Sequence, residues 1–204
     1  QRQMCIRDSS SRDALEADIN RLAAGKRVGV IGGGVRPFGL AGEVTMAAPD
    51  QLFAEAEIFA FLGSGMWGEA EQQQLEQALR QPGRMLCVAN PDIGAPLGDQ
   101  FSTEPGYWAV RAMQATGTRP LWFGKPHLPA FEIALARLQD VYGRPFDRHR
   151  VGMVGDSLHT DVLGASAAGL QSVLLTDYGL FSDGGTAAMI RRCSITPDWV
   201  VATL

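Results

Sequence analysis

Along this chain, short apolar runs alternate with longer stretches in which apolar residues recur at helical spacing. Buried strands are predicted where mostly apolar residues follow one another, at residues 27–31, 58–62, 85–89 and 151–155. Helices are predicted where apolar residues recur on one face, at residues 10–24, 69–80, 107–115 and 129–138. Strands that alternate with helices favour an α/β fold built on parallel sheets.

The composition is that of a chain with a buried core and no specialised surface. Its 204 residues are 46% hydrophobic, which suffices for one large or two small domains. A net charge of −4 without a sizeable basic cluster argues against a nucleic-acid partner. No apolar run reaches the roughly 18–20 residues that would span a membrane. With no signal peptide visible, we expect a cytoplasmic protein with no membrane partner.

The three cysteines, Cys5, Cys87 and Cys193, lie far apart and lack the spacing of zinc or redox sites. Cys87 falls inside a predicted strand and is expected to be a small buried hydrophobe. We therefore expect no disulfide scaffold.

The motif Gly155-Asp-Ser-Leu-His-Thr-Asp161 follows the last of the strands named above. Asp156 is expected at the carboxyl tip of that strand, and Asp161 where the next helix begins. Mg²⁺ usually takes one or two protein carboxylates, keeps several waters and bridges to substrate phosphate. We therefore predict that Asp156 is a Mg²⁺ ligand and expect phosphate chemistry.

Lys125 lies in the loop between an apolar stretch at 120–123 and the helix predicted at 129–138. Its ammonium group is a compact charge that can neutralise a phosphate and a nearby nucleophilic carboxylate. A lysine before a helix is by itself more often a surface residue. Beside the Asp156 motif, the functional interpretation is favoured.

Two glycine-containing motifs suggest other functions, and each lacks a required residue. Gly155-Asp-Ser-Leu158 is the signature of a class of serine esterases with Ser157 as nucleophile, but no histidine follows residue 159 to act as its base. Gly32-x-Gly34 after a strand suggests dinucleotide binding, but Pro37 occupies the position of the third glycine. A tight glycine turn explains the second pattern more simply.

Four stretches together resemble the haloacid-dehalogenase-like (HAD) phosphatases of the subclass with a large α/β cap. They are residues 87–92, residues 124–127, residues 155–169 and residues 197–200. The resemblance implies a Rossmann-like HAD core, of which this chain holds the C-terminal half at 119–204, and an inserted α/β cap domain at 10–118. Residues 1–9 fit neither the periodicity nor the family and are expected to be a non-native leader.

One departure from the family pattern matters most. Family members attack phosphate with an aspartate of an N-terminal Asp-x-Asp motif, and no such motif follows an apolar strand here. We therefore expect the C-terminal part of a longer phosphatase, inactive alone. The family also places the nucleophile strand beside the strand at 151–155, so we expect an unpaired edge there and poor solubility. The alternative is a non-catalytic HAD-like phosphate-binding protein.

The resemblance further implies a mechanism for the complete protein. Asp156 and the absent motif would hold Mg²⁺ against the phosphate of a small phosphomonoester, which is attacked to give an aspartyl-phosphate. Lys125 would neutralise charge, Ser157 would contact the substrate, and Asp161 would bind the metal or, more plausibly, support Asp156 and a metal-bound water.

From the cap, Asn90 and Asp92 are candidate substrate-binding residues. Turn chemistry, in which such side chains bond their own backbone, explains them equally well. A homodimer through the cap is a further expectation from the family, and the sequence does not identify the substrate.

Overall fold

The computed structural model describes residues 10–32, 34–97, 100–182 and 184–203. The expected leader at 1–9, with Cys5, lies outside the described residues. The chain divides into two compact units, Ser10–Gly124 and Lys125–Leu204. No helix in the described ranges is long and apolar enough to cross a membrane.

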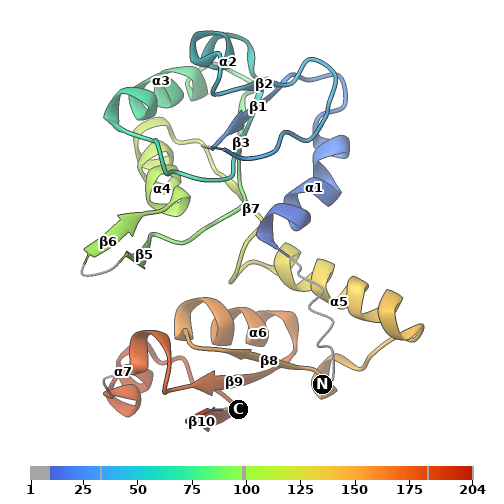
Figure 1. Cartoon of the computed structure of the whole chain (residues 1–204), viewed down its shortest axis with the longest axis vertical. Coiled ribbons are helices and arrows are strands. Elements are labelled where there is room, and N and C mark those ends of the chain that lie inside the picture. The colour runs from blue at the N-terminus through green and yellow to red at the C-terminus, as the bar shows by residue number, and fades with distance from the viewer. Residues whose placement is uncertain (1–9, 33, 98–99, 183, 204) are drawn as a thin grey trace. The chain divides into compact units, whose positions relative to one another are not determined.

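The first unit is a parallel sheet with helices, and it carries an antiparallel hairpin, β5–β6 (Figure 1). Its strands lie in the order β2-β1-β3-β4-β7, and neighbours pair in parallel throughout. In chain order the elements are α1 (Ser11–Leu22), β1 (Val28–Ile31), β2 (Val44–Thr45), α2 (Pro49–Glu55), β3 (Ile58–Phe61), α3 (Glu69–Leu79), β4 (Met85–Val88), β5 (Gly94–Leu97), β6 (Gln100–Thr103), α4 (Pro105–Thr116) and β7 (Leu121–Trp122).

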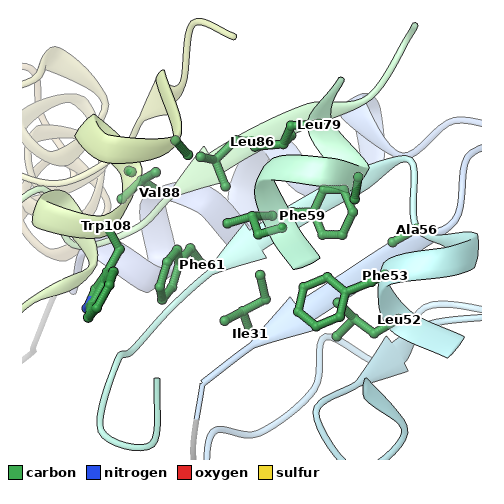
Figure 2. Packing of buried hydrophobic residues seen from close by; sticks show 14 of the residues in the cluster. Ile31, Leu52, Phe53, Ala56, Phe59, Phe61, Leu79, Leu86, Val88 and Trp108 are labelled. Atoms are coloured by element: carbon green, nitrogen blue, oxygen red, sulfur yellow. The ribbon is translucent and has the colours of Figure 1, made fainter. Parts of the chain in front are cut away.

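Aromatic side chains of this unit gather on one side of its sheet. Phe59 and Phe61 are fully buried on β3, and Phe53 of α2 stacks on Phe59 with ring centroids 6.3 Å apart. Figure 2 shows Ile31 and Leu86 of the flanking strands in the same cluster. Because both faces of a parallel sheet are covered, β1 and β3 are buried along their whole length.

The second unit holds a three-stranded parallel sheet in the order β10-β9-β8. Helix α6 contacts β9, and α5 packs against α6. The elements are α5 (Leu128–Tyr142), β8 (Gly152–Gly155), α6 (Leu163–Ala168), β9 (Gln171–Leu175), α7 (Thr186–Cys193) and β10 (Trp199–Val201). The π-helical turn Leu158–Val162 precedes α6, and two 3₁₀ turns lie at Arg148–Arg150 and Gly179–Phe181.

The predicted α/β class is confirmed. The strands and helices predicted from the sequence are also present, with ends that differ by a few residues. The units divide after residue 124, whereas we expected the boundary after residue 118. The difference arises because β7 pairs with β4, Cys87 opposite Leu121, and so keeps the following residues with the first sheet. Cys87 is fully buried, and burial raises the pKa of its thiol to about 12, in agreement with a structural role.

Candidate active site

The loop that carries Asp156 is fixed at both ends by packing. It leaves the carboxyl end of β8, and Leu158, 1% exposed, anchors it in the small core of the second unit. The chain then makes the π-helical turn at 158–162 and continues into α6. Asp161 falls inside this turn and is buried, with 3% of its surface exposed. Asp156 therefore lies in the loop itself, whereas Asp161 is buried in the turn that follows the loop.

Asp161 organises the loop through both of its carboxylate oxygens. One oxygen, Oδ1, accepts a hydrogen bond from Lys125 Nζ at 2.6 Å. The other, Oδ2, accepts the backbone N–H groups of Asp156 and Ser157, each at 3.1 Å. A side chain at Gly155 would collide with the Asp161 carboxylate, so the glycine before Asp156 is required for this contact. Buried carboxylates are stabilised when charge-assisted bonds of this kind satisfy them.

Lys125 reaches Asp161 because of the way α5 packs. The lysine precedes α5, whose Phe131 is buried against α6 at Gly164. The lysine side chain is 47% exposed, and an ammonium group has three donors. With one donor bonded to Asp161, the ammonium group has capacity for two further hydrogen bonds.

The carboxylate of Asp156 has a different environment. Asp156 is half-buried, and within the described part of the chain its side chain has no hydrogen-bond or ion-pair partner. The backbone of Gly179, at φ +62°, presses against it so closely that a side chain there would collide with the carboxylate. Sequence reasoning missed Gly179, because no local pattern signals a contact between two loops.

These residues fit Mg²⁺ better than a structural transition-metal site. Among the described residues, no group of three or more His, Cys, Asp or Glu side chains could hold a metal ion. A single free carboxylate, Asp156, suits an ion that keeps its waters and takes further oxygens from a phosphate. Both oxygens of Asp161 are already bonded, an arrangement that favours the supporting role over metal binding. Metal binding by Asp156 or Asp161 and substrate contact by Ser157 stay predictions.

Asn90 and Asp92 lie in the other unit, after β4. The Asn90 side chain accepts the backbone N–H of Asp92 at 3.0 Å and donates to Glu104 at 3.3 Å. The turn chemistry considered above is therefore present, and contact of Asn90 or Asp92 with a substrate stays a prediction.

The part of the chain that carries Asp156 and Lys125 is similar to known proteins. Residues 122–204 match the family model described as HAD-hydrolase-like. Over these residues the chain is similar to the HAD-like hydrolases. The resemblance inferred from four sequence stretches is thereby confirmed.

Two curated phosphatases and one solved structure illustrate the similarity. Dihydroxyacetone phosphatase of Corynebacterium glutamicum is 31% identical over 121 residues, which are 59% of this chain and 40% of that protein. D-glycerol 3-phosphate phosphatase of Mycobacterium tuberculosis is 30% identical over 190 residues, 90% of this chain and 50% of that protein. The crystal structure of a possible sugar phosphatase of the HAD superfamily from Cytophaga hutchinsonii has a TM-score of 0.79 at 23% identity, covering 96% of this chain and 70% of that chain.

The chain thus spans half or less of the length of these two curated relatives. The solved structure supports the fold alone. What the whole protein acts on is therefore a matter for proposal.

Proposed function

We propose that this chain supplies the metal-binding and phosphate-neutralising half of a Mg²⁺-dependent HAD phosphatase, which hydrolyses a small phosphomonoester through an aspartyl-phosphate. The observation that carries the proposal is that Asp161 bonds both Lys125 and the backbone N–H of Asp156, whose carboxylate has no partner among the described residues. The names of the two curated relatives support a small phosphate ester as the substrate class.

Each residue has a distinct task in this proposal. Asp156 would supply a carboxylate oxygen to Mg²⁺, which would contribute Lewis-acid chemistry at the phosphate when bound. Lys125 places a positive charge against the phosphate, where negative charge is held during the reaction. Asp161 bonds both Lys125 and the backbone of Asp156 and so holds them in position. It is a positioning residue and does not touch the substrate. The proposed mechanism also needs an attacking aspartate from an Asp-x-Asp motif. These 204 residues contain no such motif.

Metal binding can be tested on this chain directly. We expect Mn²⁺, used as a paramagnetic probe for the Mg²⁺ site, to broaden the amide signals of Ser157 and Gly179 first. Asp156→Asn should abolish that broadening, because the free carboxylate is lost. Asp140→Asn, on the exposed face of α5, is the matched control and should leave it unchanged. Equal broadening in Asp156→Asn and the unaltered chain would refute the proposed ligand.

Turnover is the second test. The chain alone should hydrolyse para-nitrophenyl phosphate no faster than buffer, with or without Mg²⁺. The protein with an upstream Asp-x-Asp segment should be active, and Lys125→Ala should lower its kcat/KM by about 100-fold or more. Turnover by the chain alone that Asp156→Asn abolishes would mean that a nucleophile lies within these residues. Phosphate binding without turnover, even with that segment, would favour the non-catalytic alternative.

A further inference from the structure

The unit of residues 10–124 contains a cavity that the proposed phosphatase chemistry does not use. Its volume is about 480 Å³, within the range of small-molecule pockets. Residues that line it come from the loops after β1, β2 and β3, and from the first turn of α3. The cavity therefore lies where the three neighbouring parallel strands β2, β1 and β3 end.

The strand order makes the position of this cavity a topological switch point of the sheet. From β1 the chain continues to β2 on one side, whereas from β3 it continues to β4 on the other. Loops that leave adjacent parallel strands in opposite directions open a crevice between them, and open α/β sheets bind ligands at such switch points. Gly32 and Gly34, singled out in the sequence, both line this cavity.

One wall of the cavity is fixed although it has no regular secondary structure. Between β1 and β2, the Glu43 carboxylate accepts the backbone N–H groups of residues 38–40 at 2.8–3.0 Å. Arg12 of α1 donates to the carbonyl oxygen of Pro37 at 3.3 Å, and Pro37 itself lines the cavity. A wall held in this way is formed before any ligand arrives, which lowers the entropic cost of binding.

The lining sets the chemistry of the occupant. Met46, Met66 and Trp67 supply soft, polarizable apolar surface, and Met66 is 85% exposed at the rim. Glu71 is the charged residue of the lining, and no lysine or arginine belongs to it. Its Oε2 accepts the N–H of Gly68 at 3.0 Å, which leaves Oε1 for a ligand. A phosphate would therefore be repelled, and an aromatic cation would be attracted.

We propose that this cavity is a second small-molecule site, which binds a flat aromatic molecule that carries an ammonium or similar cationic donor and no phosphate. The aromatic ring lies against Trp67 and the two methionines, and the donor bonds Glu71. The site is separate from the Asp156 loop in chemistry, because it selects against the anions that the loop would bind.

Two probes that share an indole ring but differ in charge test the proposal. Tryptamine carries an ammonium group, and indole-3-acetate carries a carboxylate. Equilibrium dialysis against the 204-residue chain, read by indole fluorescence, should show saturable binding of tryptamine at one site. Indole-3-acetate should bind at least about tenfold more weakly. Absence of saturable tryptamine binding up to about 1 mM, or equal binding of the two probes, would overturn the proposal.

Variants place the binding in the cavity. Glu71→Gln keeps an oxygen for the Gly68 N–H and should lower tryptamine affinity about tenfold, whereas Glu76→Gln, on the same helix outside the lining, should not. Gly63 lines the cavity and has no atom within 4 Å of an added Cβ, so Gly63→Leu should fill space and block binding. At Gly65 an added Cβ likewise has no atom within 4 Å, and Gly65 lies outside the lining, so Gly65→Leu is the matched control. Equal affinities in Gly63→Leu and Gly65→Leu would contradict the assignment.

Discussion

At the scale of single residues, Asp161 and Lys125 share a hydrogen bond but should contribute very differently to stability. Asp161→Ala removes the acceptor of two backbone N–H groups in a buried loop, so we expect it to lower the free energy of unfolding by about 2–4 kcal/mol. Lys125→Ala removes a half-exposed cation but leaves Asp161 bonded to both backbone N–H groups, so it should cost less, about 1–2 kcal/mol. Urea unfolding followed by circular dichroism measures both.

Asp140→Ala, at an exposed position of α5, serves as the control and should stay close to the unaltered chain. If Asp161→Ala and Lys125→Ala destabilised equally, the bonds to the loop backbone would not be what Asp161 contributes. In the active protein, Lys125→Ala should impair activity far more than its small effect on stability would suggest.

The roles of these residues could be predicted from the sequence only in part. The spacing of Asp156 and Asp161 after an apolar strand indicated that one carboxylate stands at the strand end and the other near the start of a helix. It did not reveal that Asp161 lies within a π-helical turn with both oxygens engaged. The contact of Gly179 with Asp156 was also out of reach, because it depends on the return of a loop after β9.

At the scale of elements, one carboxylate forms side-chain hydrogen bonds between the start of β10 and β9, in addition to their backbone pairing. Asp198, just before β10, accepts the backbone N–H of Ser172 at 2.8 Å and its hydroxyl at 2.9 Å. These bonds lower the pKa of Asp198 below its ordinary value of 3.8, so the folded chain takes up this proton less readily than the unfolded chain. The stabilisation is therefore complete well above pH 3.8 and is lost as the pH falls below that value.

We expect Asp198→Asn to lower the melting temperature at neutral pH and to reduce its dependence on pH below about pH 5. The melting curves of the variant and the unaltered chain should approach each other as the pH falls below 3.8, where Asp198 is protonated first in the unfolded chain and then in the folded chain. Differential scanning calorimetry across this range measures the effect, with Asp140→Asn as the control. A gap in melting temperature that stays constant from neutral to acid pH would contradict the role of this carboxylate.

Strands made of a continuous apolar run were predictable, whereas strands without such a run were not. Strands β1, β3 and β4 are apolar runs whose residues are almost all buried, and they stand out in the sequence. Strand β2 has two residues and exists because β1 offers it a partner. The hairpin β5–β6 carries an exposed Phe101, 72% accessible, and lacks the alternation that predicts a half-buried strand.

At the scale of the whole molecule, strand order was the property that local patterns could not supply. Alternation of strands and helices predicts parallel pairing, but it does not say on which side of β1 each later strand is added. The order β2-β1-β3-β4-β7 creates the crevice proposed as a second site, and β7 moves the division between units to residue 124. Both consequences follow from pairings between distant residues.

The edge strand β8 leads to the last prediction. Within the described residues β8 pairs only with β9, and Val154 on it is 38% exposed. An apolar strand with an unpaired edge offers backbone groups to another chain, so we expect association that increases with concentration and poor solubility. Val154→Lys should raise the monomer fraction in analytical ultracentrifugation, because a charge at an edge opposes strand addition. Val141→Lys adds the same charge at a similarly exposed position, 45%, on helix α5, and should change association little. Monomeric behaviour of the unaltered chain with cooperative unfolding, or equal rescue by both lysines, would show that the β8 edge does not govern association.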